Sequence, residues 1–251
     1  MSFKHLEDSV GETRVDDYVN LFRSLHDPTK TVLGYTLDLG AYLKSVDLDD
    51  SYALFGGYAV LSHLMKEQGE NFAAVWRGSN DIDMAGSFEV IRAIKAGYKV
   101  HSCFESPNLK DKITIKLTNN GDQECRIDFY TGDFKTRFRD IEFNEHFGIS
   151  LAVIDPISII QGKLETPTEE LQHAGDVMGM LYTLERRGYD PKYVSDYFSK
   201  LKKVRLLRER IKIGKNRFMR DRLGLFPSDP YFDELESRLH KVRPAIRKNI
   251  N

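Results

Sequence analysis

Apolar residues recur along this chain with two different spacings, helical and strand-like, and both occur before about residue 150. In residues 16–46 they recur at helical spacing, with a break at Asp27-Pro28. Residues 52–55 are a short apolar run that ends at Gly56-Gly57, after which helical spacing resumes. This order predicts a strand, a glycine turn and a helix.

The stretch RGSNDIDM, residues 77–84, alternates acidic and apolar side chains. Successive side chains of a strand point to opposite faces, so Ile82 and Met84 are predicted on one face and Asp81 and Asp83 on the other. A carboxylate that leaves water without a partner is strongly destabilised. The pair of acids therefore needs either exposure to solvent or a compensating cation.

A helix and a hairpin are predicted after the acidic strand. Phe88, Ile91 and Ile94 share the apolar side of a helix over residues 88–96, and Gly97 supplies its stop. Residues 113–117 and 125–130 alternate as strands, and the turn residues 119–122 join them, which predicts a hairpin. Asp128 lies in the second strand of this hairpin, on the face opposite its apolar residues.

After residue 155 the chain carries helix-start signals instead of strand patterns. Each signal pairs an N-cap residue with a proline at the first helical position. The pairs are Asp155-Pro156, Thr166-Pro167, Asp190-Pro191 and Asp229-Pro230. We therefore predict an α+β fold. A mixed sheet flanked by helices occupies residues 1–150, with a helical N-terminal extension over residues 1–46, and a helical domain occupies residues 151–251.

The charge of this 251-residue chain, 41% hydrophobic and 30% charged, is unevenly distributed. Residues 200–251 hold 16 Lys and Arg against 6 Asp and Glu, a net of +10; because the formal total is −1, residues 1–199 carry −11. Residues 200–222 alone hold 11 basic and 2 acidic residues, together with an apolar stripe. This segment is therefore either a solvated helix face or a surface that binds RNA phosphates.

The cysteines, histidines and apolar runs argue against several other classes of protein. Cys103 and Cys125 are too few for a disulfide framework and lack metal-ligand spacing, which indicates a reducing compartment. The histidines are scattered without a metal-binding pattern. The chain begins without an apolar leader, and no apolar run is long enough to span a membrane. We expect a cytoplasmic protein that does not enter the membrane.

Three carboxylates on the non-core faces of two strands, together with the glycine turn, suit phosphoryl chemistry. Asp81 and Asp83 lie roughly 6.5 to 7 Å apart along their strand, so their carboxylates can converge on divalent cations. Mg²⁺ prefers a few carboxylates together with the oxygens of a substrate phosphate. Two such ions can hold the attacking and the leaving oxygen of an in-line displacement. Gly56 and Gly57 would let backbone amides approach a triphosphate.

The motifs FGGYAVLSHL, RGSNDIDM and CRIDFY resemble, in this order, the three core motifs of the nucleotidyltransferase superfamily related to polymerase beta. The Arg-x-Ser/Thr-x-Asp-x-Asp form, together with Gly-Gly-x-Ala, is most similar to the AbiEii/AbiGii group of toxins. A fourth motif of that group has a lysine on one helix and an aspartate on the next, and the segments IIQGKLE and LQHAGDVMGML supply Lys163 and Asp176. The resemblance covers residues 52 to about 184.

The resemblance implies a nucleotidyltransferase-like fold with a catalytic domain in residues 1–150. It implies that Asp81, Asp83 and Asp128 bind one or two Mg²⁺ ions, and that Asp128 accepts the proton of the acceptor. Gly56 and Gly57 would approach the triphosphate of a bound nucleotide.

The flanking motif residues receive further roles from the resemblance. Arg77 and Ser79 would help to hold the nucleotide or shape the loop before the acidic strand. Lys163 would neutralise a phosphate as a point charge, and Asp176 would orient that lysine or contact the substrate. The reaction would transfer a nucleoside monophosphate and release pyrophosphate.

Three hypotheses about function follow. The leading one is a Mg²⁺-dependent nucleotidyltransferase that modifies RNA such as tRNA, contacts it through residues 200–222, and is the toxin of a toxin–antitoxin or phage-defence pair with an antitoxin protein as partner. The second is a small-molecule nucleotidyltransferase of the aminoglycoside type, for which the acidic residues 1–199 suit a cationic acceptor. The third is a catalytically inert relative that binds nucleotide or protein.

Overall fold

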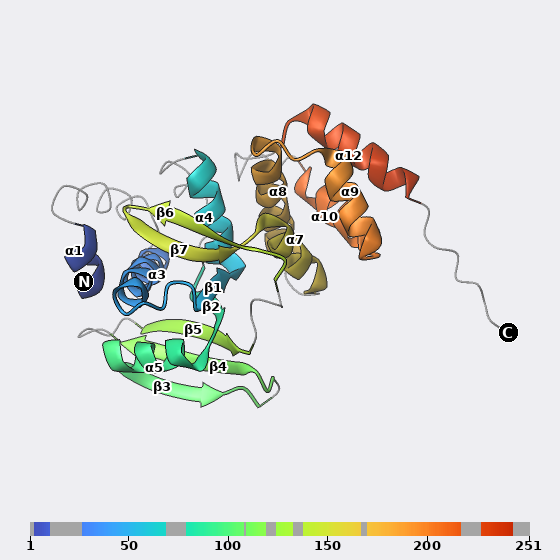
Figure 1. Cartoon of the computed structure of the whole chain (residues 1–251). Helices are drawn as coiled ribbons and strands as arrows, with labels where there is room; N and C mark the ends of the chain where they lie inside the picture. Colours follow the sequence, from blue (N-terminus) through green and yellow to red (C-terminus); the bar gives the residue numbers. More distant parts are fainter. Residues whose placement is uncertain are drawn as a thin grey trace. The chain divides into compact units, whose positions relative to one another are not determined.

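The computed structural model describes residues 3–10, 27–68, 79–107, 109–118, 124–132, 138–166, 170–216 and 227–242. The chain divides into two compact units, Met1–Ile159 and Ile160–Asn251. The first contains a mixed sheet with flanking helices, and the described part of the second is helical (Figure 1). The predicted class, a mixed sheet flanked by helices and followed by a helical part, is confirmed.

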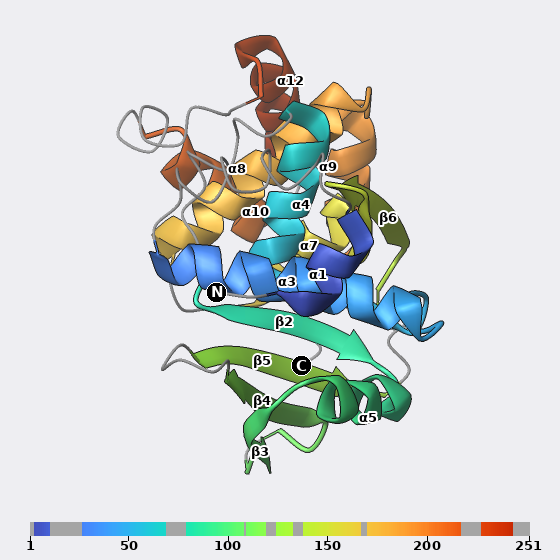
Figure 2. The same ribbon diagram turned by 90° about the vertical axis from the view of Figure 1, so that its left-hand side faces the viewer.

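The described residues of the first unit contain a seven-stranded mixed sheet with the order β3-β4-β5-β2-β1-β7-β6. The strands are β1 (Tyr52–Phe55), β2 (Asp81–Gly86), β3 (Val100–Glu105), β4 (Lys112–Thr118), β5 (Glu124–Thr131), β6 (Ile141–His146) and β7 (Ile149–Ile154). β4 and β5 form the predicted antiparallel hairpin. β2 runs parallel to β5 and antiparallel to β1, and Figure 2 shows β2 and β5 side by side.

Helices pack on the face of this sheet that carries its apolar side chains. They are α3 (Asp27–Ser45) and α4 (Gly56–Gln68), while α1 (Lys4–Val10) and α5 (Phe88–Gly97) pack against α3. α3 contacts β2, β5 and β7, and α4 contacts β1, β2 and β6. Ile82, Met84, Ile127 and Phe129 are fully buried, so the predicted core faces of β2 and β5 are confirmed. Because α3 contacts three strands of the sheet, it is part of the hydrophobic core of the first unit.

The predicted apolar face of α5 was wrong in one position, whereas its predicted end at Gly97 is confirmed. Val90 and Ile94 are buried, whereas Phe88 is 57% exposed. Val90 completes the stripe that faces the core, which turns Phe88 toward solvent. A Cβ atom on Gly97 would lie 2.5 Å from Cζ of Tyr42. This glycine therefore also allows α5 to approach α3 closely.

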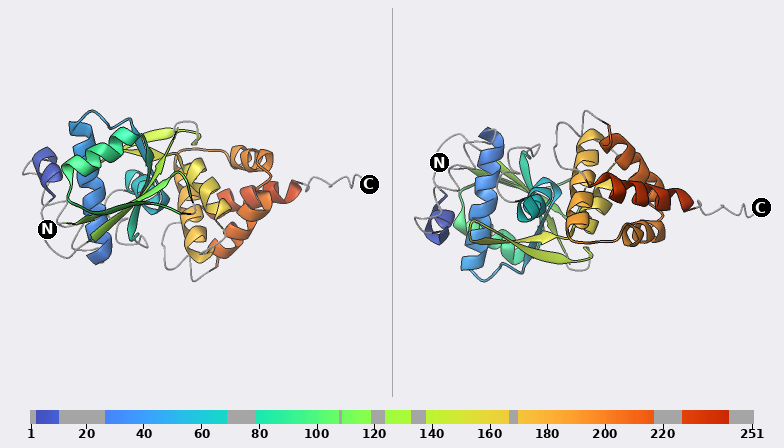
Figure 3. Two further views of the ribbon diagram at one scale, coloured as in Figure 1. Left: turned by 90° about the horizontal axis from the view of Figure 1, so that it is seen from below. Right: turned by 90° about the horizontal axis from the view of Figure 1, so that it is seen from above.

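The second unit is built from helices that pack on one another. They are α7 (Pro156–Glu165), which begins in the first unit, α8 (Glu170–Arg186), α9 (Pro191–Lys200), α10 (Val204–Gly214) and α12 (Asp229–Lys241). α10 contacts α8, and α12 contacts α9. Figure 3 shows these helices in yellow to red. In the described part of the chain, no helix is both long and apolar enough to cross a membrane.

Two of the predicted helix starts are confirmed and one is corrected. Asp155 caps α7 by accepting hydrogen bonds from the amides of residues 157 and 158, at 3.0 and 3.3 Å. Asp190 caps α9 and accepts from the amide of Lys192 at 2.6 Å. At α12 the cap is Ser228, because Asp229 is already the first helical residue. The start at Thr166-Pro167 lies next to residues 167–169, which are outside the described residues.

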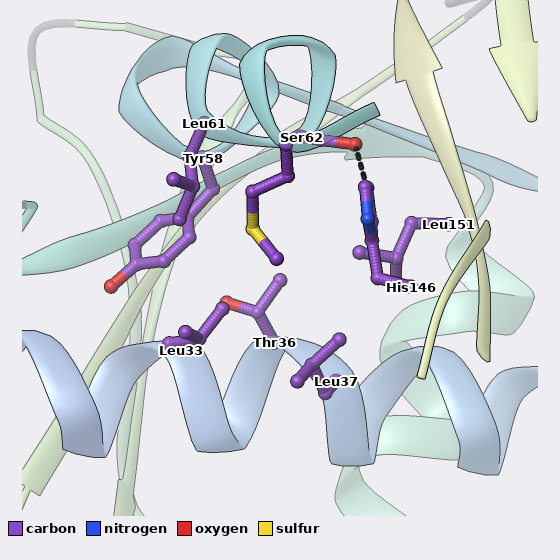
Figure 4. Close-up of a pocket in the computed structure, with 9 residues that line it drawn as sticks. Leu33, Thr36, Leu37, Tyr58, Leu61, Ser62, His146 and Leu151 are labelled. Atoms are coloured by element: carbon purple, nitrogen blue, oxygen red, sulfur yellow. Dashed lines mark hydrogen bonds between the residues drawn. The ribbon is translucent and has the colours of Figure 1, made fainter. Parts of the chain in front are cut away.

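A buried polar network joins α4 to β6. Ser62 and Nε2 of His146 share a hydrogen bond of 2.8 Å, the amide of Asn144 donates to the Ser62 hydroxyl at 3.1 Å, and Lys66 donates to Oδ1 of Asn144 at 2.8 Å. Figure 4 shows Ser62 and His146 at one side of a mainly apolar pocket between α3 and α4. Burial and the charge of Lys66 lower the pKa of His146 to about 4. The ring is therefore neutral at pH 7.

We expect His146 to make the fold sensitive to acid. An unfolded histidine titrates near pH 6.5, so between pH 6.5 and 4 the unfolded chain binds a proton that the folded chain does not. Its contribution to stability is complete above pH 6.5 and is lost as the pH falls, by roughly 2 to 3 kcal/mol between pH 7.5 and 4.5. Urea unfolding of the wild type and of His146→Gln, which keeps a polar group near Ser62, measures this difference.

The matched control is His101→Gln, which replaces an exposed histidine of β3. It should keep the pH dependence of the wild type, whereas His146→Gln should lose less stability in acid than either. Equal pH dependence in all three proteins would contradict the buried neutral histidine.

Candidate active site

The parallel pairing of β2 with β5 brings three predicted site residues together. In the register of the two strands, Asp83 lies opposite Asp128, and Asp81 lies opposite Arg126. The ligand oxygens of Asp81, Asp83 and Asp128 all lie within 4.8 Å of one another. Asp128 is 3% exposed, while Asp81 and Asp83 are half-buried. We call these three residues the acidic cluster.

Gly56, the first residue of α4, lies directly against the acidic cluster. Its φ is +66°, in the left-handed region, and a Cβ atom there would lie 1.9 Å from Oδ2 and 2.8 Å from Cγ of Asp83. No side chain fits in that space. The glycine is therefore required twice, by the turn between β1 and α4 and by the position of the Asp83 carboxylate.

Asp128 is neutralised by its neighbours on β4 and β5. Lys112 donates to Oδ2 at 2.6 Å and Thr114 to Oδ1 at 2.9 Å, while Arg126 donates to both oxygens at 2.9 and 2.6 Å. Burial alone would raise the pKa of Asp128, but the hydrogen bonds from Arg126, Lys112 and Thr114 outweigh it and hold the pKa below its ordinary value. The carboxylate is therefore ionised at neutral pH.

The donor set of the cluster fits a hard divalent cation such as Mg²⁺, which prefers carboxylate oxygens. The oxygens of Asp81 and Asp83 converge, and the Ser79 hydroxyl donates to Oδ1 of Asp81 at 3.2 Å. The two oxygens of Asp128 already accept four hydrogen bonds, which is about the capacity of a carboxylate. Asp128 must therefore give up one of its donors before it can bind a cation.

The partners of Asp128 on β4 were not predicted from the sequence. Lys112 and Thr114 alternate with the apolar residues of the strand, so a strand pattern alone places them on its non-core face. Their contact with Asp128 also needs the register, which pairs Thr114 with Asp128 and Lys112 with Tyr130. The alternation of polar and apolar residues in β4 could therefore have indicated that Lys112 and Thr114 lie on the non-core face. The register of β4 against β5, which brings them to Asp128, could not be read from that pattern.

The other predicted site residues are Arg77, Ser79, Lys163 and Asp176. Arg77 is outside the described residues. In the loop before β2, the carbonyl of Ser79 accepts a hydrogen bond from the hydroxyl of Tyr58 at 3.4 Å. In the second unit, Nζ of Lys163 lies 2.7 Å from Oδ2 of Asp176, with side chains 13% and 3% exposed. The two residues of the fourth motif are thus a largely buried ion pair.

The basic segment 200–222 is described up to residue 216. Its helix α10 buries Ile211 in the second unit, and several of its cations have partners there. Lys203 pairs with Glu165, and Lys215 donates to Glu236 at 2.9 Å. The exposed cations on α10 are Arg205, Arg208 and Lys212. Part of the positive charge of this segment therefore stabilises the helical unit itself.

Comparisons with known proteins leave the family open. No protein-family model matches the chain. No curated protein matches it either. Among solved structures, the chain is similar to an antigenic nucleotidyltransferase-like protein from Paracoccidioides brasiliensis, at 14% identity and a TM-score of 0.43, covering 82% of this chain and 97% of that one.

Proposed function

We propose that the protein transfers a nucleoside monophosphate from a nucleoside triphosphate to an acceptor hydroxyl, in a Mg²⁺-dependent reaction that releases pyrophosphate. The observation that carries the proposal is the acidic cluster, whose ligand oxygens lie within 4.8 Å of one another beside the Gly56 turn. When bound, divalent ions activate the attacking oxygen and neutralise charge on the leaving group.

In this proposal Asp81 and Asp83 hold the ions and Asp128 faces the acceptor. The acceptor oxygen bonds to the α-phosphorus as the bond from that phosphorus to the pyrophosphate oxygen breaks. Because Arg126 and Lys112 hold the pKa of Asp128 low, this carboxylate is a weak base while both cations remain in place. Asp128 therefore positions the acceptor first. It takes the hydroxyl proton only after the side chain of Arg126 or Lys112 has moved away from it.

The other motif residues contact the donor nucleotide in this proposal. Gly57 follows Gly56 at the start of α4, where backbone amides favour a phosphate. Arg77 and Ser79 precede the acidic strand and hold the nucleotide. Lys163 neutralises a phosphate, and Asp176 orients the Lys163 side chain through their ion pair of 2.7 Å.

We further propose that the acceptor is RNA, such as tRNA, and that the protein is a toxin of the AbiEii/AbiGii type with an antitoxin protein as partner. The resemblance of the glycine and Asp-x-Asp motifs to that group supports this subtype. The exposed cations of α10 support a polyanionic acceptor.

A small cationic acceptor of the aminoglycoside type is the second candidate. Lys203 and Lys215 form ion pairs with acidic residues of the second unit. These ion pairs favour the second candidate, because they reduce the positive charge that segment 200–222 offers to RNA. The net charge of −11 over residues 1–199 would attract such an acceptor.

Incubation with each of the four labelled nucleoside triphosphates, with Mg²⁺ and total RNA or an aminoglycoside, tests these proposals. Mass spectrometry of the products identifies donor and acceptor together. We expect RNA to gain one nucleoside monophosphate per modified molecule. Label on the aminoglycoside alone would favour the second candidate. If calorimetry detects no Mg²⁺-dependent binding of any nucleoside triphosphate, the protein is an inert relative and the enzymatic proposal is wrong.

A further inference from the structure

The sheet face that carries the acidic cluster continues across β4 to the edge strand β3. In the register of these strands, Phe104 lies opposite Thr114, and Thr114 lies opposite Asp128. The Thr114 hydroxyl donates to Asp128 at 2.9 Å, so these side chains share one face. Phe104 is on the same face, at the edge of the sheet, and is 50% exposed.

Basic residues flank this phenylalanine. Lys112 and Lys116 lie two positions on either side of Thr114 in β4, and Arg126 lies opposite Lys116 in β5. Diagonal neighbours on adjacent strands are roughly 7 to 8 Å apart, which is within reach of long side chains. The Arg126 side chain is 48% exposed although it also binds Asp128. An exposed aromatic ring therefore lies among cations next to the acidic cluster.

We propose that Phe104, Lys116 and Arg126 form a platform that binds the acceptor of the reaction as single-stranded RNA. A base stacks on the Phe104 ring while the two cations contact the backbone phosphates, the combination that proteins use for single strands. Two strand spacings place Phe104 roughly 10 Å from Asp128 across the sheet, a span of a few nucleotides. The proposal rests on the proposed nucleotidyl transfer.

The order of the strands supports an acceptor site here rather than a donor site. β1, which leads into Gly56, lies on one side of β2, whereas β5, β4 and β3 lie on the other. A triphosphate at the Gly56 turn and an RNA strand stacked on Phe104 would thus approach the acidic cluster from opposite sides. In-line displacement requires this arrangement, because the attacking and leaving oxygens lie on opposite sides of the phosphorus.

The test is the binding of a fluorescein-labelled, unstructured RNA of about 12 nucleotides to the full chain, followed by anisotropy without nucleotide. Phe104→Ala should bind at least about fivefold more weakly, and Phe104→Trp should bind as well as the wild type. The matched control is Phe143→Ala, because Phe143 is 48% exposed on β6 at the opposite edge of the sheet.

The cationic part of the platform has its own readout. Lys116→Gln should weaken binding and reduce the slope of log affinity against log salt by roughly 0.7, the value for one phosphate contact to a single strand. Lys95→Gln, which removes an exposed lysine of α5, should leave both unchanged. Phe104→Leu keeps an apolar side chain without the aromatic face. If Phe104→Ala has a lower melting temperature than the wild type, the RNA binding of Phe104→Leu decides whether the aromatic ring is required.

The platform would be overturned if Phe104→Ala and Phe104→Leu bound the RNA with the same affinity as Phe143→Ala. Weaker nucleoside triphosphate binding with unchanged RNA binding would overturn it too, because the ring would then serve the donor base. If RNA binding depends on Phe104 but no triphosphate labels RNA, the platform stands and the proposed function fails. If RNA is labelled and its KM is unaffected by Phe104→Ala, the function stands and the platform fails.

Discussion

Gly56→Ala should strongly reduce the proposed nucleotidyl transfer and weaken divalent-cation binding at the same time. The new Cβ atom would lie 1.9 Å from Oδ2 of Asp83, and rotation of the carboxylate gives no relief because Cβ of Asp83 is itself only 3.0 Å away. The strand or the turn must therefore shift. A displacement of about 1 Å in a reacting group lowers turnover roughly 100-fold, so we expect a loss of at least that size.

The same substitution also places alanine in the left-handed region, which costs about 1 to 2 kcal/mol. Gly188→Ala separates the two effects, because Gly188 has a φ of +75° and a Cβ atom there would meet nothing within 4 Å. It should lose about 1 kcal/mol of stability in urea and keep full activity. Isothermal titration with Mg²⁺ and the transfer assay compare the three proteins. Normal Mg²⁺ binding by Gly56→Ala would show that Asp83 does not depend on this turn.

Asp83→Asn should lower the transfer rate roughly 1000-fold or more while the protein stays folded. The substitution keeps the size of the side chain and removes one of the convergent negative charges of the acidic cluster. Metal-assisted stabilisation of a phosphoryl transition state amounts to several kcal/mol, and each 1.4 kcal/mol corresponds to about a factor of ten. Single-turnover transfer with saturating Mg²⁺ measures the loss.

The control for Asp83→Asn is Asp111→Asn, which alters an exposed acid in the turn before β4. It should transfer at the wild-type rate. Calorimetry should show weaker Mg²⁺ binding for Asp83→Asn and unchanged binding for Asp111→Asn. Transfer by Asp83→Asn at the wild-type rate would remove Asp83 from the site and, with it, the assignment of the cluster.

Much of the local structure followed from the sequence, because it depends on neighbours along the chain. Alternation assigned Ile82 and Met84 to the core and Asp81 and Asp83 to the other face, and the burial of the apolar pair confirms the first part. N-cap and proline signals located the starts of α7 and α9. The glycine pair marked the start of α4.

Properties that depend on packing partners were predicted less well. The apolar face of α5 was wrong at Phe88, because the stripe that faces the core depends on which element covers the helix. β3, β6 and β7 were not predicted, and the network around His146 was missed because a single histidine has no sequence pattern. Burial and its effect on pKa come from residues far away in the chain.

The sequence by itself determined which side chains are available for chemistry and on which face of its own strand each one lies. It named Asp81, Asp83 and Asp128, because alternation is a property of a single strand. Only the tertiary structure decided that β2 and β5 are parallel neighbours with Asp83 opposite Asp128, and that Gly56 leaves space for a carboxylate. Strand pairing and close approach are contacts between segments distant in sequence, so no local pattern encodes them.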